Sequence, residues 1–167
     1  MLFISALGIF MVSAVQGDCN PNMAESTPSS RFLINDDGTV TDLETGLMWS
    51  RCSQGQTYGE NDCMGSEVLL SWEDALSQNV PPTGVTTKYS DWRLPNVKEL
   101  ASIIEISCSD PSINSIVFPN TSYYVFWTSS PSIYEPYFVW SIAFQIGTVA
   151  FFYRNDLGHV RLVRGGI

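Results

Sequence analysis

The sequence predicts a single α+β domain in which twisted antiparallel sheets and two helices are held together by disulfide bonds. Three observations support this fold class. Runs of β-branched and aromatic residues begin and end the region after residue 30, and two segments with helical spacing lie between them. The chain has 167 residues, a length that suits one domain with a real core. Its four cysteines make an even count, which is typical of disulfide pairing.

The first strands are predicted from their turn residues. Residues 31–34 are expected to form a strand and residues 39–43 the returning strand. Between them lies Asn35-Asp36-Asp37-Gly38, whose Asp-Gly pair supplies the positive φ that a hairpin turn requires. A further turn at Thr45-Gly46 leads into a third strand, which begins at Leu47.

The first helix is predicted from a capping box at Ser71, in which Asp74 takes the place of the usual glutamate. The apolar residues that follow recur on one helical face as far as Val80. We expect the helix to stop at Pro81-Pro82, because proline cannot continue the hydrogen-bond ladder.

The second helix is predicted to begin after Asn96, which has Glu99 three residues further on. Val97, Leu100 and Ile103 recur at helical spacing, and this pattern extends up to Ser107.

The last third of the chain changes to strand patterns. Four runs are expected to form strands: 125–128, 137–145, 148–154 and 159–164. Ile146-Gly147 and Asn155–Gly158 are expected to join the last three runs as hairpin turns. The order of strands, helices and strands predicts antiparallel sheet with the helices packed beside it.

Four cysteines allow three disulfide connectivities. Cys52 and Cys63 bracket a short loop of turn-forming residues, and a bridge between them stabilises the domain by about 3 kcal/mol in the loop-entropy picture. Cys19 and Cys108 are then left to anchor the N-terminal part to the middle of the chain. The close C-x-x-C spacing of a zinc site is missing, so disulfides are favoured over a metal.

The N-terminal residues predict export. Residues 1–15 form an uncharged apolar run that is shorter than the roughly 20 residues of a spanning helix. Small residues at Val15 and Gly17 suit a cleavage region, so residues 1–17 are interpreted as a secretory signal peptide. No basic residue precedes the run, and the alternative is a buried N-terminal strand or helix. Residues 18–30 are expected to be a polar linker and 31–167 the folded domain of a secreted, periplasmic or envelope protein.

The charge excludes some partners. The chain carries 17 acidic and 8 basic residues, a formal net charge of −9, which excludes a nucleic-acid-binding protein. The electrostatic field of this negative charge also repels sulfated glycans and anionic membrane surfaces. Since no second apolar run reaches spanning length, we expect no membrane insertion of the mature domain.

Several motifs occur in a fixed order along the chain: DDGTVTDLETGLMWSRC (36–52), SWEDAL (71–76), SDWRLPNVKELASIIE (90–105), VFPNT (117–121), FWTSSP (126–131) and VRLVRGG (160–166). Together they resemble the Lcl C-terminal domain family, a domain of unknown function, from about residue 31 to residue 166. The resemblance implies a fold related to C-type lectin-like and formylglycine-generating-enzyme-like domains. It also implies a bacterial envelope or secreted protein with an adhesive or glycan-binding role.

Two properties of the family's relatives are not expected here. The adhesin that gives the family its name is associated with sulfated polysaccharides, whereas this domain is strongly acidic. The cysteine pair of the sulfatase-modifying enzymes has no matched positions in this chain, so their oxidase chemistry is not implied.

No catalytic group stands out from the sequence. His159 is the only histidine and has no Gly-x-Ser-x-Gly elbow to pair with, so it is interpreted as a rim or core-edge residue. Glu73 and Asp74 are adjacent on a helix and point to different faces. Glu99 and Glu105 are explained by their helix positions. The alternative is a hydrolase or accessory domain that uses carboxylates brought together in space.

Metal and cofactor sites are not expected either. Asp36, Asp37 and Asp42 lie near a tight turn and could bind calcium, but the ligand spacing of an EF-hand is missing. Turn chemistry is the favoured interpretation of these carboxylates. We therefore predict no catalytic residue, no metal and no cofactor.

The aromatic residues point to binding. Four tryptophans sit inside the motifs beside core-type residues and are expected to pack in the core: Trp49, Trp72, Trp92 and Trp127. The loop with Tyr134, Glu135 and Tyr137 combines aromatic rings with a carboxylate and is the predicted ligand-binding surface, with Asn155 and Asp156 as weaker candidates. The leading hypothesis is a non-catalytic domain that binds a glycan or an envelope protein. A structural envelope component is a further alternative.

Overall fold

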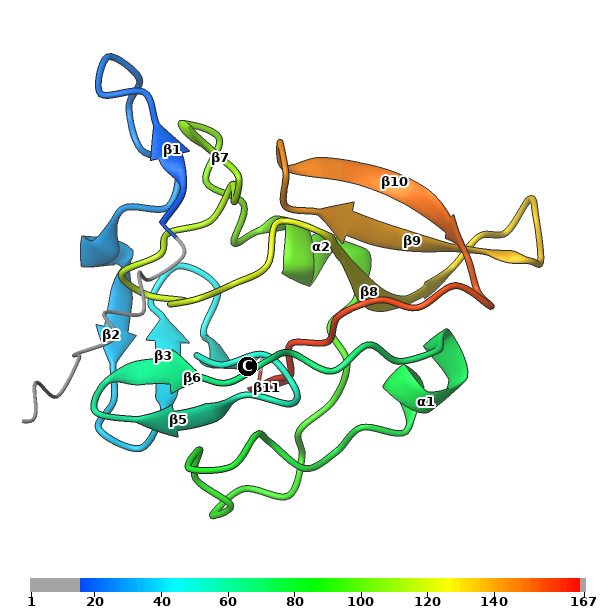
Figure 1. The fold of residues 1–167 in the computed structure, drawn as a ribbon, viewed down its shortest axis with the longest axis horizontal. Helices are drawn as coiled ribbons and strands as arrows, with labels where there is room; N and C mark the ends of the chain where they lie inside the picture. The colour runs from blue at the N-terminus through cyan, green and yellow to red at the C-terminus, as the bar shows by residue number, and fades with distance from the viewer. Residues whose placement is uncertain (1–15, 166–167) are drawn as a thin grey trace, which may run out of the picture.

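The computed structural model describes residues 16–165 as short strands in four small sheets, with two short α-helices and one 3-10 turn (Figure 1). Most of the predicted signal peptide therefore lies outside the described residues. The elements in chain order are β1 (Asp18–Cys19), η1 (Ser29–Arg31), β2 (Phe32–Ile34), β3 (Thr39–Asp42), β4 (Leu47–Ser50), β5 (Thr57–Gly59), β6 (Asp62–Met64), α1 (Trp72–Leu76), α2 (Val97–Ala101), β7 (Cys108–Ser109), β8 (Val125–Pro131), β9 (Phe138–Ala143), β10 (Thr148–Tyr153) and β11 (Val163–Gly165).

The largest sheet has the strand order β11-β4-β3-β2, and all of its pairs are antiparallel. The first hairpin is confirmed, since Phe32 faces Asp42 across the β2–β3 ladder. Gly38 in its turn has a φ of 78°, a conformation that glycine adopts at little cost.

The second sheet has the order β10-β9-β8 and packs beside α2 (Figure 1). The predicted hairpin at Ile146-Gly147 is confirmed, because β9 and β10 pair along their full length. The predicted hairpin at 155–158 is wrong. After this turn the chain leaves the sheet: the His159 N–H donates to the Val125 carbonyl at 2.8 Å, and Val163 joins the other sheet opposite Trp49. The last segment thus connects the two sheets.

Both helix starts are confirmed, and both helices are shorter than predicted. The Ser71 hydroxyl caps α1, and Asn96 and Glu99 form the full capping box of α2. Beyond α1 the Gln54 side chain donates to the Val80 carbonyl at 2.7 Å, which fixes this segment outside the helix. Beyond α2 the chain pairs with Ile113 through Ile104 instead of continuing the helix.

The two disulfides, Cys19–Cys108 and Cys52–Cys63, are the predicted pairs, and each includes a cysteine of a two-stranded sheet. Cys19 and Cys108 are partners in the β1–β7 ladder. Cys63 lies in β6, and its bridge to Cys52 ties the β5–β6 hairpin to the end of β4. Disulfides persist in oxidising compartments, so their presence is typical of a domain outside the cytosol.

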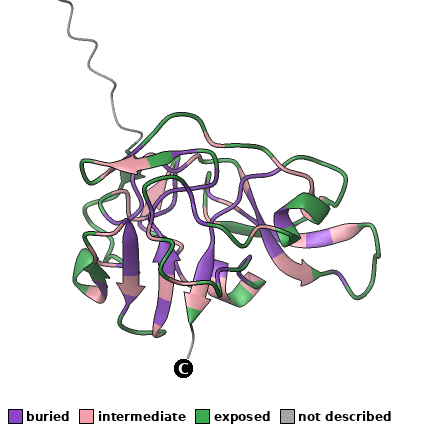
Figure 2. Ribbon diagram, turned by 90° about the horizontal axis from the view of Figure 1, so that it is seen from below, coloured by how far each residue is buried: buried purple, intermediate pink, exposed green. Residues whose placement is uncertain are grey.

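The core confirms the expectation for the four motif tryptophans. Trp49, Trp92 and Trp127 are buried, and Trp72 is half-buried with its Nε1 donating to the Thr128 carbonyl at 2.8 Å. Figure 2 shows the buried positions on the central strands and the exposed loop at the far end of the β9–β10 sheet. The fifth tryptophan, Trp140, is not in the core clusters.

Glu105 lies beyond the end of α2, so its predicted helix role is wrong. Its buried carboxylate accepts six hydrogen bonds, from the N–H and hydroxyl groups of Ser26, Thr27 and Ser107, at 2.7 to 3.2 Å. The carboxylate therefore fixes the N-terminal segment against the middle of the chain.

Candidate functional site

A continuous group of aromatic side chains covers the outer part of the β9–β10 hairpin. We define this aromatic surface by six residues: Tyr134, Tyr137, Phe138, Trp140, Phe151 and Tyr153. The β9–β10 register places Phe151 opposite Trp140 and Tyr153 opposite Phe138. Because side chains alternate along a strand, these two pairs lie on one face of the hairpin. The intervening Val139 faces the opposite way and is buried in the core.

The rings of this surface support one another. Trp140 and Phe151 have ring centroids 3.8 Å apart, and Tyr137 stacks on Tyr153 at 6.1 Å with an interplanar angle of 24°. Phe138 meets the edge of Tyr153 at 5.7 Å. Such contacts restrict the rotamers of the exposed rings. A ligand that stacks on them therefore causes little further loss of side-chain entropy.

The loop that joins β8 to β9 is held in place by hydrogen bonds. The Ser132 hydroxyl accepts hydrogen bonds from the N–H groups of Tyr134 and Glu135, and the Ser132 N–H donates to the Phe138 carbonyl at 3.0 Å. The N–H of Phe138 in turn donates to the Glu135 carbonyl at 3.0 Å. The predicted binding loop is therefore a closed turn with fixed ends.

A hollow of about 280 Å³ lies between this loop and β10, lined by Ser132, Tyr134, Glu135, Phe138 and Phe151. Tyr134 and Glu135 thus face the hollow, as two of the predicted site residues. Glu135 is exposed and forms no ion pair within residues 16–165. The hollow presents apolar ring faces with one free carboxylate at its rim.

Tyr137 does not line the hollow but extends the aromatic surface beyond it; the side chain is 59% exposed. Asn155 and Asp156 are exposed in the turn that follows β10, next to Arg154, whose N–H donates to the Tyr137 carbonyl at 2.9 Å. Neither residue lines the hollow. The structure thus brings the predicted residues Tyr134, Glu135 and Tyr137 to one surface. Asn155 and Asp156 lie at the end of that surface.

Four residues of the aromatic surface are not among the predicted site residues: Phe138, Trp140, Phe151 and Tyr153. A partial signal is present in the sequence, because β9 carries aromatic residues at alternate positions and β10 ends in three consecutive ones at 151–153. The β9–β10 register is needed to place Phe151 and Tyr153 on the same face as Trp140 and Phe138, opposite the buried Val139.

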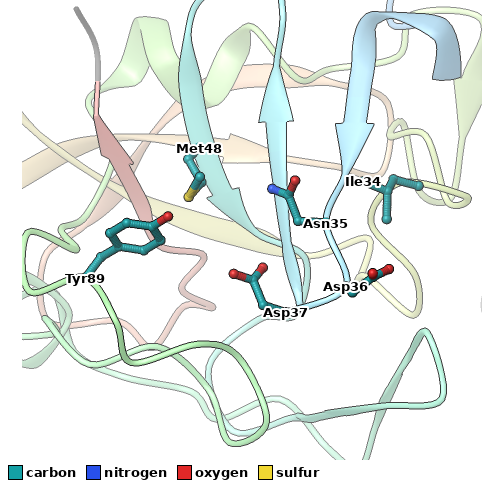
Figure 3. A pocket seen from close by; sticks show the side chains of 6 residues that line it. All are labelled: Ile34, Asn35, Asp36, Asp37, Met48 and Tyr89. Carbon is teal, nitrogen blue, oxygen red and sulfur yellow. The ribbon is translucent and has the colours of Figure 1, made fainter.

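The carboxylates of the first turn lie beside a second, open hollow of about 510 Å³ (Figure 3), lined by Ile34, Asn35, Asp36, Asp37, Met48 and Tyr89. Asp37 accepts a hydrogen bond from the Thr39 hydroxyl at 2.6 Å, which is turn chemistry. Asp42 is fully buried and accepts from Arg31 Nε at 2.7 Å. Burial raises the pKa of Asp42, but the hydrogen bonds from Arg31, Thr45 and the Glu44 N–H together outweigh this and lower it.

Residues 16–165 contain no group of three His, Cys, Asp or Glu side chains that could hold a metal ion. No helix in the same range is long and apolar enough to cross a membrane.

Comparisons with known proteins add one finding. A family model described as the Lcl C-terminal domain matches residues 38–164, a range that includes every strand from β3 to β10 and both helices. No curated protein matches the chain.

Proposed function

Since the chain belongs to the Lcl C-terminal domain family, we propose that it is an exported, non-catalytic binding domain whose aromatic surface stacks against the sugar rings of a glycan. The observation that carries the proposal is the aromatic surface itself. Tyr134, Tyr137, Phe151 and Tyr153 are 83%, 59%, 45% and 39% exposed and lie around one hollow or directly beside it. A soluble domain gains nothing in stability from keeping such large rings in water.

The chemistry of the surface suits a saccharide. Aromatic faces pack against the apolar C–H faces of sugar rings, and a carboxylate such as Glu135 accepts hydrogen bonds from sugar hydroxyls. The net charge of −9 disfavours sulfated or otherwise anionic glycans. The ligand class we propose is therefore a neutral or basic glycan.

Export is part of the same proposal. Two disulfides fit an oxidising compartment, and residues 1–17 have the pattern of a signal peptide. A secreted, periplasmic or envelope location would present the aromatic surface to polysaccharide. A fold related to C-type lectin-like domains, as the family resemblance implies, would be in keeping with this role.

A protein partner is the second candidate, and β10 is the observation that favours it. This strand carries no charge, forms the edge of its sheet and pairs only with β9 among the described elements. Such an edge can accept a strand from another chain.

The two candidates are separated by a glycan-array screen of the oxidised domain, run with calcium and again with a chelator. We expect binding to a neutral or basic glycan that is lost in Tyr134→Ala and Tyr137→Ala. The matched control is Tyr124→Ala, because Tyr124 has the same 59% exposure and lies outside the aromatic surface. If no glycan binds in either condition, the glycan proposal is excluded and a protein partner is the remaining candidate.

A further inference from the structure

A third hollow, of about 260 Å³, lies at the other end of β8 and is lined by Leu69, Tyr124, Val125, Leu157 and His159. We call it the His159 hollow. It is separate from the aromatic surface: Val125 and Pro131 are the two ends of β8, and the six residue steps between them span about 20 Å.

The walls of the His159 hollow are fixed to one another by backbone hydrogen bonds. Leu70 and Gly158 exchange two of these bonds, each of 2.9 Å, which joins the segment of Leu69 to that of Leu157. The His159 N–H donates to the Val125 carbonyl at 2.8 Å, and the His159 carbonyl accepts from Trp127. The hollow is therefore preformed and needs no rearrangement to accept a ligand.

The imidazole of His159 lines the hollow, and its two nitrogens differ in their surroundings. The His159 side chain is 9% exposed, stacks on Phe126, and places Nδ1 3.1 Å from the Glu67 carboxylate in a contact without hydrogen-bond geometry. The other nitrogen, Nε2, has no hydrogen-bond partner in the described chain and, unlike Nδ1, is not enclosed by protein atoms. Because His159 lines the hollow, Nε2 is the ring nitrogen that can pair with a ligand bound there.

The protonation state decides what that partner must be. Burial lowers the pKa of His159 and the Glu67 charge opposes this only partly, so the ring is neutral at pH 7. The nearby Glu67 oxygen favours the tautomer with the proton on Nδ1. Nε2 then carries a lone pair and accepts a hydrogen bond. The rest of the lining is Leu69, Leu157, Val125 and the ring of Tyr124.

From these contacts we infer that the His159 hollow binds a compact apolar ring that carries one hydroxyl group, a phenol, whose O–H donates to His159 Nε2. The phenol could be a free small molecule or the tyrosine side chain of a partner protein. The inference is independent of the aromatic surface and of the glycan.

The test uses the imidazole signals of the ¹⁵N-labelled chain, which are unambiguous because His159 is the only histidine. Phenol is titrated into the full chain at pH 7, and toluene serves as the matched probe of similar size without a hydroxyl. We expect a saturable shift of the Nε2 resonance with phenol. Toluene should bind at least about tenfold more weakly, because it displaces water from Nε2 without replacing the hydrogen bond.

A second measurement locates the site. Leu157→Trp should fill the hollow and abolish the phenol shift, whereas Leu33→Trp, at an exposed leucine on β2, should leave it unchanged. A titration with N-acetyl-tyrosinamide distinguishes the two sources of the phenol. Binding of N-acetyl-tyrosinamide would indicate the tyrosine side chain of a partner protein, whereas binding of phenol alone would indicate a free small molecule. Toluene binding as tightly as phenol, no saturable shift, or phenol binding retained in Leu157→Trp would each overturn the inference.

Discussion

The Glu105 carboxylate holds the segment around Ser26 and Thr27 to the rest of the domain, and replacing it by glutamine should be costly. Burial raises the pKa of Glu105, but hydrogen bonds from Ser107, Ser26 and Thr27 to the charged form outweigh this and lower it to about 2. Against an ordinary value of 4.5, the difference of about 2.5 pKa units corresponds to about 3 kcal/mol of folding free energy. Glu105→Gln removes the charge and turns an NH₂ group toward hydrogen-bond donors. The free energy of unfolding at pH 7 should therefore fall by about 3 kcal/mol.

The sign of the pH dependence follows from the direction of the pKa change. Because the pKa of Glu105 is lower in the folded state than in the unfolded state, its stabilisation is fully present above pH 4.5 and is lost as the pH falls toward 2. The wild-type protein and Glu105→Gln should therefore differ by about 3 kcal/mol at pH 7. That difference should narrow steadily below pH 4.5.

The assay is equilibrium urea unfolding at a series of pH values, followed by tryptophan fluorescence from the buried core. Glu25→Gln is the matched control, since Glu25 lies in the same N-terminal segment but is exposed. The control should change the unfolding free energy by less than about 0.5 kcal/mol. A loss below about 1 kcal/mol for Glu105→Gln at pH 7, or a loss that does not depend on pH, would refute the reasoning.

Three further variants test individual interactions that stabilise the fold. Arg161 is fully buried, and its terminal nitrogens donate to backbone carbonyls of residues 50 and 51 and to two hydroxyls, so Arg161→Lys should destabilise the domain by about 3 kcal/mol in urea unfolding. Replacing Cys52 and Cys63 together by alanine should cost about 3 kcal/mol by the same assay, a loss that dithiothreitol treatment of the wild type should reproduce or exceed. Asn96→Ala removes the cap of α2 and should lower stability by about 1 kcal/mol, whereas an unchanged melting temperature would contradict the capping role.

Local chemistry made several elements predictable. The Asp37-Gly38 turn, the caps at Ser71 and Asn96 and the Ile146-Gly147 hairpin depend on a few neighbouring residues, and each is present in the structure. The lengths of the helices were not predictable in this way. Beyond each helix a residue from another part of the chain holds the segment: the Gln54 side chain binds the Val80 carbonyl after α1, and Ile113 pairs with Ile104 after α2.

Long-range pairing explains the wrong predictions. Residues 159–164 have a strand pattern, but only the three-dimensional arrangement decides that they leave β10 and that Val163 pairs with Trp49. Glu105 has a helical position in the sequence, and its partners Ser26 and Thr27 lie almost 80 residues away. For the aromatic surface, the loop rings were predictable from composition. Phe151 and Tyr153 required the β9–β10 register and the exposure of that face, which only the three-dimensional structure shows.

The most direct test of the account is a calorimetric titration of the strongest array glycan into the wild-type domain, Tyr137→Ala and Tyr124→Ala. Both tyrosines are 59% exposed, but only Tyr137 belongs to the aromatic surface. We predict that Tyr137→Ala weakens binding by about tenfold or more, the loss of one stacking ring, and that Tyr124→Ala binds as the wild type does. Equal affinities of all three proteins, or weaker binding only in Tyr124→Ala, would contradict the assignment of the glycan to the aromatic surface.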